Sequence, residues 1–275
     1  MKKYFNFAQD STFDCIGEVY TKKGKFILSC VLITNNYVLS SAHGFFKESK
    51  ESVIDTITVL NKRYPIKRAK YSILENKSQF IFKFKDKSFF AKRIIIHPEY
   101  NDDFHSDGYN DIAIIELTES IDFIKPAVLY TDTNELNSKG IICGFGVNSN
   151  AIGKRKFLIR KKMAGENIID SIGGNKINGT HGVLYADMDN PKSIVCNRMG
   201  SPTPLELEWH GGAGDCGGGL FILQNHKWQL AGISFAPSYF EDWKVYGEKY
   251  GYYGFIDGWT RISPLNDWIK SLIEQ

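Results

Sequence analysis

Short stretches of β-branched and aromatic residues alternate with turn residues along most of the chain. Six of them lie in the first half, at 25–34, 37–42, 55–61, 78–84, 91–97 and 111–117. Six more lie in the second half, at 140–147, 156–163, 182–188, 219–223, 227–236 and 253–263. Glycine, asparagine and aspartate clusters separate the stretches, as turns require. This spacing predicts an all-β protein built as a sandwich or as barrels.

The pattern changes in the middle of the chain and again at its end. TESIDFIKPAVLYTD, at 118–132, predicts a linker between two β units. Near the end, apolar residues recur with helical spacing, at Leu265, Trp268, Ile269, Leu272 and Ile273. Ser263 is placed to cap this helix, with Pro264 in its first turn. We therefore predict three parts: a β unit in 1–120, a second β unit in 121–262 and an amphipathic α-helix in 263–275.

The composition is that of a globular protein with an ordinary core. Of the 275 residues, 43% are hydrophobic and 24% are charged, which are typical proportions. The net charge of +3 is too small for this length to favour a nucleic-acid partner. No stretch reaches the roughly 18 consecutive apolar residues of a membrane helix. We expect neither nucleic acid nor a membrane as a partner.

The N-terminus and the cysteines both bear on location. MKKYFNFAQDSTFDC has a short basic start but lacks the apolar run of a secretory signal. The cysteines are odd in number and form no C-x-x-C pattern: Cys15, Cys30, Cys143, Cys196 and Cys216. Buried, reduced thiols in a reducing compartment are the ordinary interpretation of this usage. We predict a cytoplasmic protein without a bound metal, with secretion by another route as the alternative.

Cys216 differs from the other cysteines because glycines surround it in GAGDCGGGLFI, at 212–222. Glycines adopt backbone angles that other residues avoid. Successive N–H groups can then point into one concavity, which holds the oxyanion of an acyl-transfer intermediate. The donors would be the N–H groups of Gly214 and Cys216. A thiol at this centre becomes a nucleophile when a base activates it.

Two residues stand at strand ends, where a base and an orienting acid would be placed. His43 follows the apolar strand of YVLSSAHGFF, beside a tight turn. Asp111 begins the alternating strand DIAIIEL, where we expect it to be half-buried. Such a carboxylate holds an imidazole in one tautomer and orientation. His43, Asp111 and Cys216 are therefore the candidate catalytic residues, and their chemistry needs no cofactor.

Five segments resemble the trypsin/chymotrypsin family of proteases, in the family's order. They are VLITNNYVLSSAHGFF at 31–46, IIIHPEYNDDFHSDGYNDIAIIEL at 94–117, GAGDCGGGLFI at 212–222, WQLAGISFAPS at 228–238 and GWTRISPLNDWIKSLI at 258–273. The resemblance covers most of the chain from about residue 16. The GDCGG loop is also similar to that of enterovirus-type cysteine proteases, which share the fold.

The resemblance implies a chymotrypsin-like fold, in which two six-stranded β-barrels hold the active site between them. It implies an endopeptidase that acts on proteins or peptides. In it, His43 is the general base, Asp111 its orienting acid and Cys216 the nucleophile. The N–H groups of Gly214 and Cys216 form the oxyanion hole.

The resemblance also implies four residues of the substrate-binding cleft. Ser234 and Phe235 lie on the substrate-binding strand, and Ser234 would contact Asp111. His210 stands at the floor of the primary specificity pocket, where trypsins carry aspartate. Asp257 lies near the wall of that pocket. Asp257 would select a basic side chain or pair with His210 to select a polar one; an exposed aspartate in a turn is the alternative.

Three departures from the family leave alternatives open. Cysteine stands in place of serine at 216. The chain is a natural cysteine protease, a trypsin-like serine protease with its nucleophile replaced, or a pseudoprotease that binds peptides; we predict the first. The remaining cysteines do not match the family's disulfides, which agrees with a reducing compartment. The I-V-G-G start of activated trypsins is missing, so Asp215 requires an internal group, or an activating trigger or partner.

Two charged segments have ordinary interpretations. Asp102, Asp103 and Asp107 lack the full spacing of a calcium loop, and a solvated turn is predicted instead. The basic run 153–162 is predicted to be a solvated strand face rather than a surface for an acidic partner.

Overall fold

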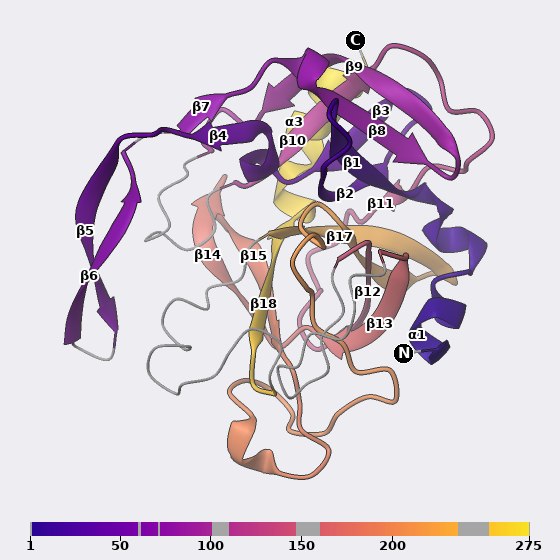
Figure 1. Ribbon diagram of the computed structural model, residues 1–275. Coiled ribbons are helices and arrows are strands. Elements are labelled where there is room, and N and C mark those ends of the chain that lie inside the picture. The colour runs from indigo at the N-terminus through magenta and orange to yellow at the C-terminus, as the bar shows by residue number, and fades with distance from the viewer. Residues whose placement is uncertain are drawn as a thin grey trace.

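Six antiparallel strands form a closed barrel in the first half of the chain. The structure, a computed structural model, describes residues 2–59, 62–70, 72–100, 110–146, 160–235 and 253–274. The barrel strands are β1 (Ile16–Thr21), β2 (Phe26–Leu32), β3 (Tyr37–Ser40), β8 (Phe80–Phe84), β9 (Lys87–Ile96) and β10 (Ala113–Leu117). They pair in the order β1-β2-β3-β10-β9-β8 (Figure 1).

The barrel core follows directly from the alternation of side chains along its strands. In β8, Phe80, Phe82 and Phe84 are buried, whereas Ile81 and Lys83 between them are partly exposed. Successive side chains of a strand point to opposite faces. The three rings therefore fill the barrel interior, and the predicted β structure of the first part is confirmed.

Two small sheets extend from the barrel between β3 and β8. β4 (Phe46–Glu48) pairs with β7 (Ser72–Leu74), and β5 (Ser52–Val59) pairs with β6 (Lys62–Ala69). The β5–β6 ribbon projects away from the barrel (Figure 1). The sequence pattern predicts β5 but not β6, because β6 carries four charged residues and a proline, which weaken a strand pattern.

An eight-stranded sheet forms the second half of the protein. Its strands are β11 (Val128–Leu129), β12 (Lys139–Gly144), β13 (Met163–Ile168), β14 (Ser171–Ile177), β15 (Thr180–Asp187), β16 (Gly219–Gln224), β17 (Lys227–Phe235) and β18 (Ile256–Arg261). Seven follow the path β13-β12-β16-β17-β18-β15-β14, and β11 pairs with β17 in parallel. The β14–β15 hairpin turns at Asn178 and Gly179, whose φ angles are 49° and 81°. Asn-Gly is typical of such a two-residue turn.

This second sheet differs in strand number and closure from the six-stranded barrel that the resemblance implies. Among the described residues, no ladder joins β13 to β14 at the two ends of the path. Instead, the amide of Asn167 on β13 donates to the carbonyl of Asp187 at the end of β15, at 2.9 Å. It also donates to the carbonyl of Trp209, at 3.2 Å. A side chain therefore supplies hydrogen bonds where the strand ladder stops.

The end of the chain forms the predicted helix after one 3-10 turn. The turn is η5 (Ser263–Leu265), and the helix is α3 (Asn266–Ile273). Leu265 and Ile269 are buried in the larger core cluster, which joins residues of the first barrel and of the second sheet, and Trp268 packs against it. The apolar stripe is therefore confirmed, and it faces a core that both halves of the protein share.

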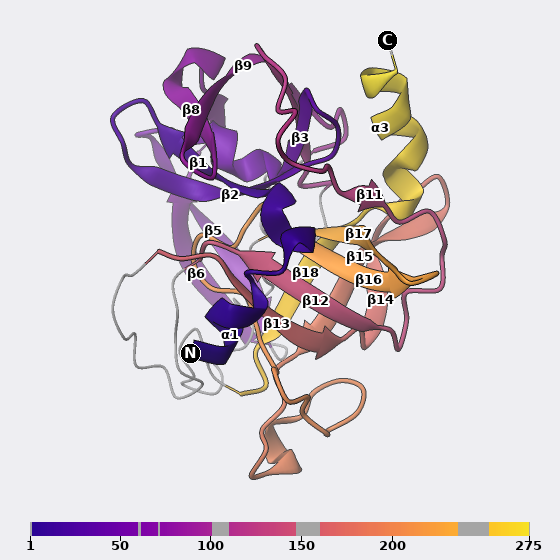
Figure 2. The same cartoon turned by 90° about the vertical axis from the view of Figure 1, so that its right-hand side faces the viewer.

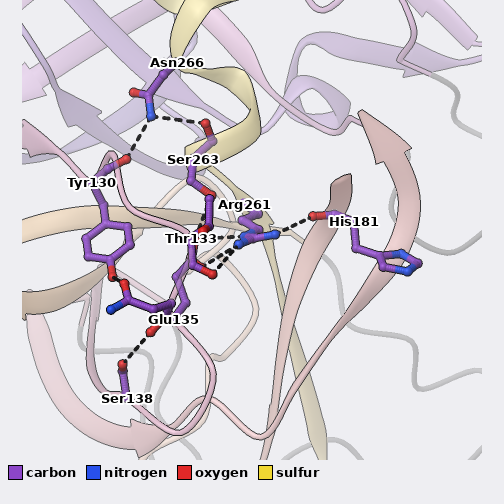
Figure 3. Close-up of polar contacts among 9 residues, drawn as sticks. Tyr130, Thr133, Glu135, Ser138, His181, Arg261, Ser263 and Asn266 are labelled. Atoms are coloured by element: carbon purple, nitrogen blue, oxygen red, sulfur yellow. Dashed lines mark hydrogen bonds and ion pairs between the residues drawn. The ribbon is translucent and has the colours of Figure 1, made fainter. Parts of the chain in front are cut away.

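The predicted cap is wrong. Neither η5 nor α3 has a side-chain cap hydrogen bond. The Ser263 hydroxyl instead donates to the Glu135 carboxylate at 2.7 Å (Figure 3). Glu135 is fully buried and also accepts from Arg261. A buried carboxylate needs several donors, and it takes the hydroxyl that would otherwise cap the helix.

The N-terminal residues form two further elements that the strand pattern does not indicate. α1 (Lys2–Phe7) lies against β13 (Figure 2), and η1 (Ser11–Cys15) leads into β1. The remaining 3-10 turns are η2 (Ala42–Phe45), η3 (Lys77–Gln79) and η4 (Ile194–Cys196). No helix in the described part of the chain is long and apolar enough to span a membrane. The acidic turn with Asp102, Asp103 and Asp107, and most of the basic run 153–162, lie outside the described residues.

Candidate active site

The predicted base, His43, and the predicted acid, Asp111, lie together at the ends of two paired strands of the first barrel. His43 lies in η2, directly after β3, and Asp111 directly precedes β10, which pairs with β3. The Asp111 Oδ1 accepts the backbone N–H of His43 at 2.9 Å, and its Oδ2 lies 2.6 Å from the ring Nδ1. Because a carboxylate only accepts hydrogen bonds, Nδ1 carries a proton. The other ring nitrogen is left for chemistry.

Asp111 is buried more deeply than the predicted half-burial. Its side chain is 8% exposed, whereas that of His43 is 35% exposed. Thr260 of β18 donates to the backbone carbonyl of Asp111 at 3.1 Å. The second sheet therefore covers this aspartate, which a pattern confined to one strand does not reveal.

Cys216 comes to the same place from the loop before β16 in the second sheet. Burial lowers the pKa of His43, but the nearby Asp111 carboxylate and Cys216 thiol outweigh burial and raise that pKa well above its ordinary value. The His43 ring is therefore placed between an acid and a thiol. Both neighbours favour the protonated imidazole.

The other cysteines lack these surroundings. Cys15, Cys30 and Cys143 are buried, and Cys216 is partly exposed; all four are free thiols. Burial raises the pKa of Cys15 to about 12 and that of Cys30 and Cys143 well above the ordinary value. Among the cysteines whose side chains the structure describes, Cys216 is thus the accessible one.

In the glycine loop, some backbone N–H groups donate hydrogen bonds within the protein and others do not. Asp215 N donates to Gly212 O at 2.9 Å, Gly217 N to Ser234 O at 2.7 Å, and Gly218 N to Asp215 O at 2.7 Å. Among the described residues, the N–H groups of Gly214 and Cys216 donate to no acceptor. These are the two predicted oxyanion donors.

A strand of the first barrel holds this loop in position. Ser29 of β2 donates its backbone N–H to Cys216 O at 2.8 Å and its hydroxyl to Gly214 O at 3.0 Å. A Cβ at Gly217, where φ is 80°, would lie 2.1 Å from the Ser29 carbonyl oxygen. Ser29 is not among the predicted site residues, although a polar residue in the apolar run KFILSCVLIT is a usable signal.

Asp215 is held by backbone groups. It is buried, and its two carboxylate oxygens accept the N–H groups of Gly146 (2.6 Å) and Gly212 (2.7 Å). Burial raises the pKa of Asp215 to about 6, and these hydrogen bonds oppose the rise. These contacts agree with the first of the two alternatives for Asp215, in which an internal group rather than a trigger or partner holds it.

The two predicted pocket residues meet at the peptide of Gly211. His210 Nδ1 lies 2.6 Å from Gly211 O, and Asp257 Oδ2 accepts Gly211 N at 2.6 Å. Asp257 is buried within β18, so the alternative of an exposed aspartate in a turn is wrong. Burial lowers the pKa of His210 to about 4 and raises that of Asp257 well above its ordinary value. Burial therefore favours the uncharged form of both groups.

The substrate-strand residues are placed at the end of β17. Ser234 accepts at its carbonyl from the Ser41 hydroxyl (3.1 Å) and from Gly217 N. In the described part of the chain Ser234 makes no hydrogen bond to Asp111, and a contact between the two stays a prediction. Both carboxylate oxygens of Asp111 are already occupied by His43. Phe235 is buried and pairs with Gly258 of β18.

A closed antiparallel barrel beside a second β-sheet, joined at a His–Asp pair and a glycine loop, defines the class of chymotrypsin-fold peptidases. A family model described as Trypsin matches residues 5–269. The chain belongs to the trypsin family and is a trypsin-like peptidase.

Proposed function

We propose that this peptidase is an endopeptidase with Cys216 as its nucleophile. One observation carries the proposal. The Cys216 thiol lies beside a His43 ring whose Nδ1 is held by Asp111, and the N–H groups of Gly214 and Cys216 have no acceptor among the described residues. Nucleophile, base, orienting acid and oxyanion donors are thus available in one place.

In the acylation step, His43 Nε2 takes the thiol proton as the sulfur of Cys216 bonds to the carbonyl carbon of the scissile peptide. The carbonyl oxygen becomes an oxyanion held by the N–H groups of Gly214 and Cys216. The intermediate then collapses, the C–N bond breaks, and His43 gives its proton to the leaving amine. A thioester to Cys216 remains.

In the second step, water releases this acyl-enzyme. His43 takes one proton from the water as its oxygen attacks the thioester carbon, and the same two N–H groups hold the second oxyanion. The C–S bond breaks, and the proton returns to the sulfur. The cycle needs no group beyond the protein and water.

The electrostatics of His43 support a thiol in this position. The pKa of His43 is raised well above its ordinary value despite burial, because Asp111 and Cys216 favour the imidazolium. A thiol gives up its proton to a base more readily than a hydroxyl does, and the thiolate is the reactive form. A serine hydroxyl, with a far higher pKa, would gain much less from the same neighbour.

The pocket groups support a preference for an uncharged polar side chain before the scissile bond. His210 is neutral at pH 7 because burial lowers its pKa to about 4, and burial also favours the neutral form of Asp257. An uncharged pocket floor can hydrogen-bond to a substrate side chain, but it offers no charge to attract an ionised one. A basic side chain is the alternative, and a substrate screen separates the two.

The first experiment measures alkylation of Cys216 by iodoacetamide at pH 7, by intact mass and peptide mapping, together with cleavage of a peptide library. We expect selective labelling at Cys216, loss of cleavage in step with labelling, and slower labelling in His43→Ala. Cys216→Ala must abolish cleavage; full cleavage by that variant contradicts the proposal. Peptide binding without any cleavage would instead assign a peptide-binding module.

The serine alternative needs one more variant. If Cys216→Ser cleaves the library faster than the parent chain, the loop is built for serine, and the thiol is a replacement. We expect the opposite, because a thiol gives up its proton to a base such as His43 more readily than a hydroxyl does.

A further inference from the structure

A series of aromatic rings leads from the N-terminal helix to the predicted pocket floor. The centroids of Tyr4 and Trp209 are 5.0 Å apart, those of Trp209 and His210 are 6.3 Å apart with planes at 17°, and those of His210 and Phe255 are 5.3 Å apart. Tyr4, Trp209, His210 and Phe255 form what we call the ring series. It joins three segments that are distant in sequence.

Polar contacts attach α1 to the same segment. The Tyr4 hydroxyl donates to Glu208 O at 3.1 Å, and Lys3 Nζ donates to Glu206 O at 2.6 Å. Both acceptors are backbone carbonyls within four residues of His210. Helix α1 therefore holds the segment before His210 through hydrogen bonds to that segment's main chain, as well as through the ring contact of Tyr4 with Trp209.

Strand β13 also holds Trp209. The backbone N–H of Trp209 donates to Glu166 O at 2.9 Å, and its backbone carbonyl accepts from the Asn167 side-chain amide at 3.2 Å. A Cβ at Gly165 would lie 2.2 Å from the Trp209 Cβ, so only glycine fits there. The indole is 7% exposed, and Tyr4 packs against the core cluster that contains it. Loss of the Tyr4 ring would expose the indole on that side.

We propose that Tyr4 and Trp209 are positioning residues that fix His210, so that α1 belongs to the substrate-binding machinery. This proposal rests on the proposed function, in which His210 forms the floor of the specificity pocket. The proposal gives α1 a role in substrate binding, which the sequence of its six residues does not indicate. Neither Tyr4 nor Trp209 would touch the reacting atoms.

The test compares Tyr4→Ala with Tyr4→Phe and with Lys2→Ala, which changes an exposed residue of the same helix, as the control. NMR of the His210 ring reports the floor directly. We expect Tyr4→Ala to shift the His210 signals and to move its pKa upward from about 4, because solvent reaches the rings. Tyr4→Phe and Lys2→Ala keep the ring contact and should leave these signals near those of the parent chain.

Kinetics supply the second readout. Tyr4→Ala should raise KM about threefold to tenfold, the factor expected when one aromatic contact is lost, with kcat and iodoacetamide labelling of Cys216 within about twofold. Tyr4→Phe should restore KM. All assays are run at a temperature where circular dichroism shows the variants folded, and Tyr4→Leu replaces Tyr4→Ala if the alanine variant does not fold.

Two results would overturn the proposal. One is an unchanged His210 spectrum in Tyr4→Ala or Tyr4→Leu. The other is a fall in kcat and in Cys216 labelling equal to the rise in KM, which means general loosening of the second sheet. If the parent chain cleaves no peptide, the proposed function fails, whereas the His210 spectra still decide whether Tyr4 positions the ring.

Discussion

Asp111 holds His43 at two points, with Oδ1 on the backbone N–H at 2.9 Å and Oδ2 near the ring Nδ1 at 2.6 Å. The backbone contact fixes where the residue lies, and the ring contact fixes its tautomer and orientation. Both anchors come from one carboxylate that the second sheet covers through Thr260. The arrangement of His43 is therefore a property of both halves of the protein.

Asp111→Asn should separate these two anchors. The amide oxygen can still accept the His43 N–H, but the amide NH2 beside Nδ1 favours the tautomer with the proton on Nε2, which cannot act as a base. We expect kcat to fall about 10²- to 10⁴-fold with little change in Tm. Thr260→Val removes only the contact to the Asp111 backbone and is the milder control. An unchanged kcat in Asp111→Asn would show that the carboxylate does not orient the base.

The titration of His43 provides a prediction that does not depend on a substrate. Its pKa is raised in the folded protein by Asp111 and Cys216 against the effect of burial. The stabilisation from this group is therefore fully present below about pH 6.5, the unfolded value. It is lost as pH rises through the folded pKa.

We expect NMR of the His43 ring to show a midpoint well above the unfolded value of about 6.5, and a lower midpoint in Asp111→Asn and in Cys216→Ala. A midpoint at or below that unfolded value in the parent chain would mean that burial outweighs the two neighbours.

The oxyanion loop gives a prediction with a matched control. Gly214 has φ of 100°, and a Cβ there would lie 2.7 Å from a ring carbon of Phe26. Gly214→Ala should lower kcat about 10²- to 10³-fold, the cost of a lost oxyanion donor, and alter iodoacetamide labelling far less. Gly24 has φ of 81°, and a Cβ added there would meet no atom within 4 Å, so Gly24→Ala carries backbone strain alone. Equal effects of the two substitutions on kcat would refute a special role for Gly214.

Sequence patterns predict the elements whose stability is local and miss those that depend on distant contacts. The phenylalanines of β8 and the stripe of α3 show their periodicity within one element, so both are expected and found. α1 has six residues and buries none of them. It is held by contacts such as Tyr4 with Glu208, 204 positions away, which no local pattern reveals.

The same distinction applies to the candidate site. His43, Asp111 and Cys216 are recognisable from their ordered segments, because each lies in a motif. Ser29 of β2 holds the loop and Gly146, two residues after β12, holds Asp215, and these partners are visible only in three dimensions. Asp257 has no motif that distinguishes a buried pocket residue from a turn, and its burial decides between them.

Four buried or partly buried carboxyl groups in the second half of the protein predict a pH-dependent stability. They are Asp170, Asp187, Asp189 and Glu208, and burial raises the pKa of each, to about 7 for Asp170 and Glu208 and about 6 for Asp189. A carboxyl group with a raised folded pKa stabilises the fold below its unfolded value. That stabilisation is lost as pH rises through the folded pKa. The free energy of unfolding should therefore fall between about pH 4, near the unfolded values, and about pH 8.

Asp170→Asn should remove part of that fall. The asparagine oxygen can still accept the Asp187 N–H, now at 3.3 Å from Asp170, and its amide can donate toward the Asp187 carboxylate. We expect a gain of roughly 1–2 kcal/mol at pH 8, reduced because solvent screens the partly exposed side chain, and a smaller gain at pH 5, measured by urea unfolding. Asp86→Asn, at an exposed turn, is the control. An equal effect of Asp170→Asn at both pH values would contradict the titration argument.

The pair of Glu135 and Arg261 predicts a large loss of stability from one substitution. Arg261 Nη2 lies 2.6 Å from Glu135 Oε2, with side chains 4% and 0% exposed. The guanidinium also donates to the carbonyls of Thr133 and His181 (Figure 3). Glu135→Gln leaves a buried charge without its counter-ion, which costs about 3–5 kcal/mol.

The control is the more exposed pair of Lys139 and Glu166, at 2.8 Å with Lys139 49% exposed. Lys139→Ala should cost less than about 1 kcal/mol, because solvent screens such a pair. The double variant Glu135→Gln with Arg261→Met should recover much of the stability, since it removes the unpaired charge. If the single and double variants unfold at the same urea concentration, the loss comes from packing around Glu135 rather than from the uncompensated charge of Arg261.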